Sequence, residues 1–198
     1  MPARAATTAA AGARSAGLRT AADLLRAAGA GSVAWAVVDG QWVDAALFAL
    51  TLGGLMLPRI LAVVPALDLL YAVVVLFAAW SAVLDLYVTY DRLDVVVHTV
   101  ACGLVTGTVH RLLVTRSVLP SPGDRVLGRA AVGVVVTVVA LGLALGVLWE
   151  VGEWLGHTYL DQRIQVGYDD TMGDLVSDGL GALAAGLLVL RIARPGSR

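Results

Sequence analysis

The stretch Ala130–His157 reads AAVGVVVTVVALGLALGVLWEVGEWLGH and contains no charged side chain before Glu150. About 20 apolar residues in a helix cross the hydrocarbon core of a bilayer, so this stretch is long enough to span a membrane. In lipid the backbone polar groups must pair internally, and a stretch without strand-like alternation pairs them as a helix. We therefore predict a transmembrane helix over 130–157.

Further stretches of the chain are also apolar and long enough to span. In chain order they lie at about 42–57, 66–88, 93–115 and 170–191. Leu18–Val38 also has helical periodicity, but Asp23 and Arg26 interrupt it, so five crossings remain the alternative if this segment lies on the membrane surface. Of all residues, 59% are hydrophobic and 15% charged, which excludes an ordinary soluble domain. The predicted fold class is an all-α integral membrane bundle of about six transmembrane helices.

The predicted crossings leave room only for short tails. Residues 1–17 are rich in Ala, Thr and Arg and lack apolar periodicity, so we predict a disordered N-terminal tail there. The crossings then form a single transmembrane domain over 18–192, followed by a short C-terminal tail at 193–198.

The arginines predict the orientation. With six crossings, most of them fall on one side of the membrane, namely Arg4, Arg14, Arg19, Arg26, Arg59, Arg111, Arg116, Arg125, Arg129, Arg191, Arg194 and Arg198. The positive-inside rule makes this side cytoplasmic, so both termini are predicted to be cytoplasmic in a bacterial-type inner membrane. Arg92 and Arg163 fall on the other side, where acidic and interfacial aromatic residues gather.

Three predicted helix ends meet at this extracytoplasmic level, and each has ionisable side chains on one face. The sets have helical spacing, and from the fourth to the sixth crossing they are Asp91, Asp94 and His98; Glu150, Glu153 and His157; and Asp170, Asp174 and Asp178. Matching depth along the helices puts His98, Glu150 and either Asp174 or Asp178 in a deep layer. The shallower layer then contains Asp94, Glu153 and Asp170, with Asp91 and His157 at the rim.

So many carboxylates near lipid cannot all stay ionised without a compensating charge. Carboxylates with one or two imidazoles suit Mn²⁺, Fe²⁺, Zn²⁺ or Mg²⁺, so a divalent metal ion is an economical counter-charge. Ionisable residues inside a crossing are functional by default. We predict a metal site with ligands from His98, Glu150, Glu153, Asp94, Asp170 and Asp174.

Ordinary structural roles compete with ligation at several positions. Asp170 is expected to cap the last helix, and Asp68 suits the first turn of a helix because of the helix dipole. Gly181 is expected to allow close helix packing rather than to bind a ligand. His157, at the rim, is expected to be dispensable for metal binding.

Three segments around these residues resemble the YjdF-like family of bacterial inner-membrane proteins. The segments are Tyr90-Asp91-Arg92-Leu93 running to His98 and Gly103, Leu148–Trp154, and Gly167–Asp174 with Gly181-Ala182. The resemblance covers about residues 58–190 and includes the patterns E-x-x-E-W and D-T-x-x-D followed by G-A. It implies a multi-helix membrane protein with site residues His98, Glu150, Glu153, Asp170 and Asp174.

One position departs from the family pattern. In the family, histidine follows the aspartate of Y-D-R by four residues, whereas here that spacing belongs to Asp94 and His98. Asp91 keeps the motif and Asp94 keeps the spacing, so either can be the equivalent acid.

Three classes of function remain open. The leading hypothesis is a metal-dependent membrane enzyme acting on a lipid or small envelope substrate, with Glu153 or Asp94 as general base toward a water molecule on the metal. The alternatives are a secondary transporter or metal or proton carrier using the same acids, and a structural or partner-binding membrane protein. The sequence has no P-loop, nucleophile elbow, haem motif or nucleic-acid-binding patch. The oligomeric state is left open.

Overall fold

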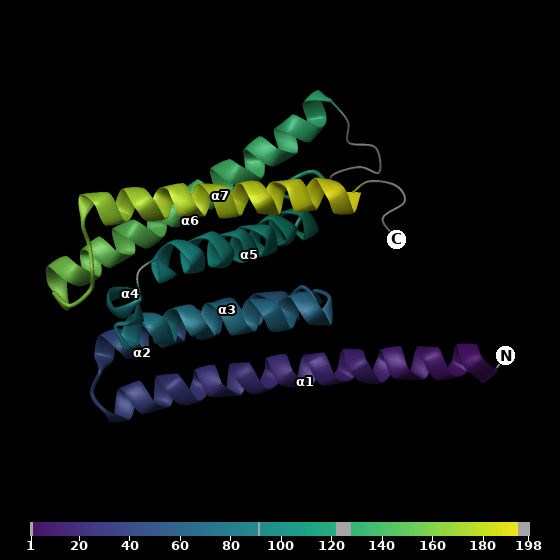
Figure 1. Ribbon diagram of the computed structural model, residues 1–198, viewed down its shortest axis with the longest axis horizontal. Coiled ribbons are helices and arrows are strands. Elements are labelled where there is room, and N and C mark those ends of the chain that lie inside the picture. The colour runs from purple at the N-terminus through teal and green to yellow at the C-terminus, as the bar shows by residue number, and fades with distance from the viewer. Residues whose placement is uncertain (1, 91, 122–127, 194–198) are drawn as a thin grey trace. The chain divides into compact units, whose positions relative to one another are not determined.

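The computed structural model describes residues 2–90, 92–121 and 128–193. Within these ranges all regular secondary structure is helical. The helices, shown in Figure 1, are α1 (Pro2–Val38), α2 (Trp42–Ile60), α3 (Pro65–Val83), α4 (Leu86–Thr89), α5 (Leu93–Thr115), α6 (Arg129–Tyr159) and α7 (Tyr168–Ala193). Six of these helices, all except α4, are long and apolar enough to cross a membrane. The predicted all-helical membrane fold is confirmed.

Some helix boundaries differ from the prediction. α1 begins at Pro2, so the stretch predicted to be a disordered tail is helical from residue 2. Alanine has the highest helix propensity, and proline is well tolerated in a first helical turn, so this stretch can be helical without apolar periodicity. The predicted segment 66–88 is divided: α3 ends at Val83, and Asp85 has a left-handed backbone with φ 52° before α4 begins.

The described chain forms two compact units, and the prediction of a single transmembrane domain over 18–192 stays a prediction. Unit 1 is Met1–Asp85 and contains α1, α2 and α3, and unit 2 is Leu86–Arg198 and contains α4 to α7. Each unit brings its helices together through its own contacts.

Aromatic rings and alanines hold unit 1 together. Trp35 of α1 stacks on Trp80 of α3 with ring centroids 5.4 Å apart, and Phe48 of α2 lies 5.0 Å from the same indole. The Trp80 indole N–H donates to the Ser32 hydroxyl at 3.2 Å. Buried alanines allow the three helices to approach around these rings.

A buried ion pair explains how α1 accommodates the charges that interrupt its sequence. Arg26 is 6% exposed, and its guanidinium contacts the carboxylate of Asp68 in α3, which is 2% exposed. The same guanidinium donates to the Leu55 carbonyl at 2.9 Å and to Asp23 Oδ1 at 2.9 Å. Charges paired in this way can lie in a membrane-spanning helix. The contacts support six crossings over five, and Asp68 has a partner that the sequence did not indicate.

Glycines bring α5, α6 and α7 of unit 2 close together. A Cβ atom on Gly103 of α5 would lie 2.9 Å from the carbonyl oxygen of Gly181 in α7, so the two backbones are in direct contact. On α6, a Cβ atom on Gly142 would overlap Ala182 and one on Gly146 would overlap the Asp178 carboxylate. The predicted packing role of Gly181 is confirmed.

The same contacts give the helix directions in unit 2. His98 faces Asp178, and Gly103 faces Gly181, so residue numbers rise together along α5 and α7, which are therefore parallel. On α6, Gly146 faces Asp178 of α7, and Gly142 faces Ala182 of α7. Residue numbers along α6 thus fall as those along α7 rise. α6 is therefore antiparallel to both, and Figure 1 shows it crossing α7 obliquely.

The outer surfaces of these helices are apolar. Large exposed side chains include Val132, Val136 and Leu148 on α6 and Leu180 and Leu187 on α7. Buried positions in unit 2 include several polar residues, such as Thr106, Asp174 and Asp178. An apolar exterior around polar interior groups is the arrangement that a bilayer favours.

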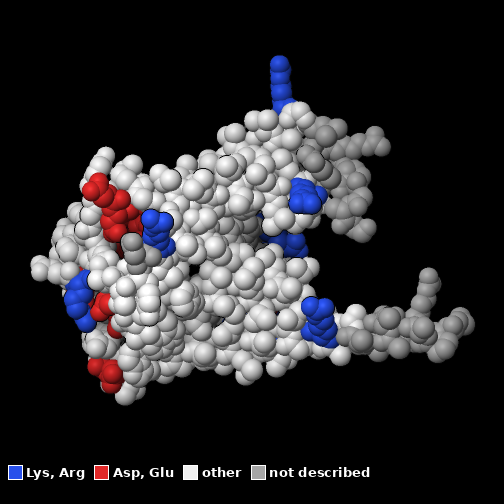
Figure 2. All heavy atoms as spheres, viewed as in Figure 1, with Lys and Arg blue, Asp and Glu red and all other residues white. Residues whose placement is uncertain are grey.

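Charge is distributed unequally between the two ends of unit 2. One end contains the α6–α7 connection and the first turns of α5 and α7, and Figure 2 shows acidic side chains there with arginine beside them. At the opposite end Arg116 follows α5, Arg129 begins α6, and Arg191 lies in the last turn of α7. This separation follows the pattern on which the predicted orientation rests.

Candidate metal centre

The first turns of α5 and α7 bring the central side chains together. Asp94 and His98 are four residues apart on α5, and Asp174 and Asp178 are four residues apart on α7, so each pair shares one helix face. Because α5 and α7 are parallel and start at the same end, these two faces meet at equal depth.

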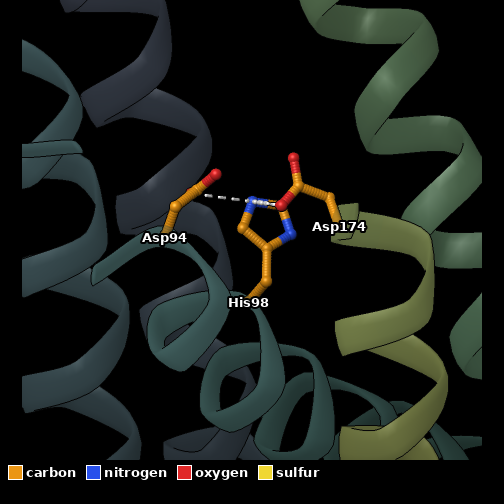
Figure 3. A group of neighbouring side chains, drawn as sticks. All are labelled: Asp94, His98 and Asp174. Atoms are coloured by element: carbon orange, nitrogen blue, oxygen red, sulfur yellow. Dashed lines mark ion pairs between the residues drawn. The ribbon is translucent and has the colours of Figure 1, made fainter. Parts of the chain in front are cut away.

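His98 is at the centre of this group. Its Nε2 lies 3.5 Å from Asp94 Oδ1 and 3.9 Å from Asp174 Oδ1, and its Nδ1 lies 3.3 Å from Asp178 Oδ1. Figure 3 shows the carboxylates of Asp94 and Asp174 approaching the imidazole from α5 and α7. The ring therefore has carboxylates at both nitrogens.

The donor atoms of Asp94, His98 and Asp174 lie close enough to share a cation. One nitrogen or oxygen from each residue lies within 4.8 Å of the others. Nitrogen and oxygen ligands of a tetrahedral zinc ion lie about 2.0–2.2 Å from the metal, which places them about 3.3–3.6 Å from one another. The contacts of 3.5 and 3.9 Å at His98 Nε2 are near this separation, and the two carboxylate oxygens would have to approach each other to complete the set.

Glu150 of α6 adds a buried carboxylate beside this set. It is 8% exposed, and its Oε1 has no hydrogen-bond partner among the described residues. Glu150 lies on the same buried face of α6 as Gly142 and Gly146. Its carboxylate is close to the Thr171 hydroxyl and within electrostatic range of the His98 ring. A buried carboxylate oxygen without a donor is energetically costly, so this atom requires a cation or a proton.

The remaining predicted ligands lie around the same centre. Glu153, one turn further along α6, is half-buried and within electrostatic range of Glu150, His98, Asp174 and Asp94. Asp170 is half-buried and neighbours Asp94 and His98. All six predicted ligands are thus in one neighbourhood, and their binding of a metal stays a prediction.

Asp170 does not cap α7 as predicted. The helix begins at Tyr168, and the Thr171 amide already donates to the Gly167 carbonyl at 2.9 Å, so Asp170 lies inside the first turn. Its charge is still favoured there by the helix dipole, and its side chain is not needed at the cap position.

Asp178 was missing from the predicted ligand set, although it makes the shortest contact to the His98 ring. It is 3% exposed and is packed against the backbone of α6 at Gly146. The regular spacing of Asp170, Asp174 and Asp178 had indicated it as an alternative for the deep layer. Its depth relative to His98 required the structure.

Residues at the rim have their own partners. His157 Nδ1 lies 2.6 Å from the Ile164 carbonyl oxygen, which ties the end of α6 to the following connection. In that connection, hydrogen bonds from the Arg163 side chain and backbone amide hold the pKa of the Asp161 carboxyl below its usual value. Asp91, the other candidate for the family acid, lies outside the described residues, while Asp94 is in contact with His98.

Comparison with known proteins places the chain in a family. The sequence profile of a family described as "Predicted membrane protein (DUF2238)" matches residues 21–195. The chain belongs to this family. The match is consistent with the YjdF-like resemblance and extends it toward the N-terminus, to include the second half of α1. No curated protein and no solved structure matches the chain.

The residues that match the DUF2238 profile lie in both units. The matched residues include the second half of α1, all of α2 and α3 in unit 1, and every described side chain of the cluster in unit 2. The family description establishes a membrane protein and specifies no activity.

Proposed function

We propose that this DUF2238 protein binds a divalent metal ion through Asp94, His98, Asp174 and Glu150, near the extracytoplasmic face of the inner membrane. We further propose that it uses the ion to hydrolyse a lipid or small envelope substrate. The observation that carries the proposal is Glu150 Oε1, a buried carboxylate oxygen without a donor among the described residues, beside an Asp–His–Asp set whose ligand atoms lie within 4.8 Å of one another.

A cation accounts for this cluster better than internal ion pairs do. The ion pairs found among these described acids all use His98, which has one positive charge at most and contacts three carboxylates. The nearby Arg163 is held by Asp161 at the rim, at 2.7 Å. Carboxylates and imidazole together suit borderline and hard divalent metals. The +2 charge of such an ion offsets the negative charge of the carboxylates that the single positive charge of His98 leaves uncompensated.

The chemistry follows from the positions of the acids. A divalent ion held by these residues would supply Lewis-acid chemistry toward a substrate oxygen and a water molecule. Glu153 is half-buried and next to the set, so it is placed to accept the proton that the attacking water loses. The water oxygen then bonds to the carbonyl carbon or phosphorus, the ester bond breaks, and Glu153 returns the proton to the leaving oxygen. Asp94 is the alternative base.

The proposed location rests on charge. The positive-inside rule assigns the arginine-rich end of unit 2 to the cytoplasm. Both termini are then cytoplasmic, and the acidic end lies on the extracytoplasmic side. The cluster then lies at the depth of the outer leaflet, within reach of lipid headgroups and of the periplasm.

Metal binding in purified protein tests the proposal. Wild type, stripped with chelator and titrated with Zn²⁺ or Mn²⁺, is expected to bind one ion, and Glu150→Gln, which keeps shape and removes charge, is expected to bind at least tenfold more weakly. Asp169→Asn is the control, because Asp169 is an exposed acid of the same helix. Equal binding by all three proteins would refute the site. Ion uptake into sealed vesicles without ester hydrolysis in detergent would favour a carrier over an enzyme.

A further inference from the structure

Resting on the proposed metal site, we propose that Asp178 is the positioning residue of His98. It accepts a hydrogen bond from Nδ1–H and so presents the unprotonated Nε2 to the metal between Asp94 and Asp174. Asp178 itself lies on the far side of the ring and is not a ligand.

The two nitrogens of His98 face different carboxylates. Asp178 Oδ1 lies 3.3 Å from Nδ1, whereas Asp94 Oδ1 and Asp174 Oδ1 lie 3.5 and 3.9 Å from Nε2. The contact at Nδ1 has hydrogen-bond geometry, and an ionised carboxylate only accepts hydrogen bonds, so with Asp178 ionised Nδ1 is the donor. In a neutral imidazole with a proton on Nδ1, the lone pair is on Nε2, which is the nitrogen within the Asp94–His98–Asp174 group.

The position of Asp178 is fixed from its other side by α6. A Cβ atom on Gly146 would overlap Asp178 Oδ2 and lie 3.1 Å from its Cγ, so only glycine leaves room for the carboxylate at this place. Asp178 is 3% exposed and has little freedom to turn away. Gly146 thus has a role in the site although it contributes no polar atom.

The arrangement is the one that metal-binding histidines commonly have. A carboxylate on the second ring nitrogen fixes the tautomer and the ring orientation, and losing it typically lowers metal affinity about 10–100-fold. The second observation that supports a ligand here is the buried Glu150 Oε1, which has no partner among the described residues.

Zinc affinity in variants tests the role of Asp178. Asp178→Ala is expected to weaken Zn²⁺ binding about 10–100-fold, while Asp178→Asn, whose amide oxygen still accepts from Nδ1–H, loses less. Gly146→Ala is expected to weaken binding by displacing the carboxylate. Its matched control is Gly152→Ala on the same helix, where an added Cβ meets open space. Equal affinity in Gly146→Ala and Gly152→Ala would overturn the packing argument.

The tautomer gives a readout that a purely structural residue would not move. The chain has three histidines, so ¹⁵N-histidine labelling with His98→Gln for assignment resolves the His98 ring nitrogens. In the zinc-bound wild type we expect the proton on Nδ1, and in Asp178→Ala a loss of this single tautomer. Circular dichroism confirms that each variant is folded, and Asp178→Asn replaces Asp178→Ala if the latter is not.

The outcomes separate the two proposals. If the wild type binds no zinc, the metal site fails, and the role of Asp178 fails with it. If the wild type binds zinc and Glu150→Gln does not, but Asp178→Ala keeps both affinity and tautomer, the metal site stands and the positioning role of Asp178 is refuted.

Discussion

Arg26→Leu is the sharpest test of how unit 1 is stabilised. The substitution leaves Asp68, which is 2% exposed, as a buried carboxylate without its guanidinium partner. Removing one member of a buried ion pair costs about 3–5 kcal/mol. For a chain of this size each kcal/mol shifts the unfolding midpoint by about 2–4 °C, so the expected decrease in Tm is roughly 6–20 °C.

Two comparisons isolate the cause. The double variant Arg26→Leu/Asp68→Leu removes both charges, and we expect a Tm near that of wild type, because buried pairs contribute little beyond apolar residues of similar volume. Arg59→Leu breaks a pair with Asp23 in which both side chains are 45% exposed, and such pairs contribute about 0–1 kcal/mol. Thermal unfolding in detergent measures all three. An unchanged Tm in Arg26→Leu, or a double variant less stable than the single one, would refute the reasoning.

Three further predictions concern the site and the orientation. Glu150→Gln is expected to lose metal and ester hydrolysis while remaining folded, because it removes one of several crowded charges; elemental analysis and turnover measure this, and Asp169→Asn should change neither. His157→Ala is expected to keep the metal and to lower Tm by about 2–4 °C, because it loses the roughly 1 kcal/mol hydrogen bond to the Ile164 carbonyl. Reporter fusions at both termini and in the loop 116–129 should be cytoplasmic and a fusion in the loop 161–167 external, and an external N-terminus would contradict six crossings.

The transmembrane fold could be predicted from the sequence because apolar length alone decides which segments span. Helix ends were harder to predict. The break after Val83 depends on the left-handed backbone at Asp85, and no proline or glycine marks it in the sequence. The helical start of α1 depends on alanine propensity rather than on an apolar face, so hydrophobic periodicity does not indicate it.

The site could be predicted as a neighbourhood but not as a set of contacts. Helical spacing and depth matching predict that Asp94, His98 and Asp174 belong to one cluster. The same arithmetic could not choose between Asp174 and Asp178, because both share one face of α7 and differ only by one turn. Which of the two lies level with His98 depends on how far α5 is shifted along its axis relative to α7. The backbone contact between Gly103 and Gly181 determines this shift.

That contact, between Gly103 and Gly181, gives a physical meaning to two motif positions that have no chemistry of their own. Gly103 lies five positions after His98, and Gly181 lies three positions after Asp178, so the contact between the two glycines fixes the depth of both side chains. A methyl group at either position would push α5 and α7 apart and pull the imidazole away from its carboxylate. The motif therefore encodes a distance as well as a set of ligands, and we expect evolutionary change at the two glycines to be coupled to change at His98 and Asp178.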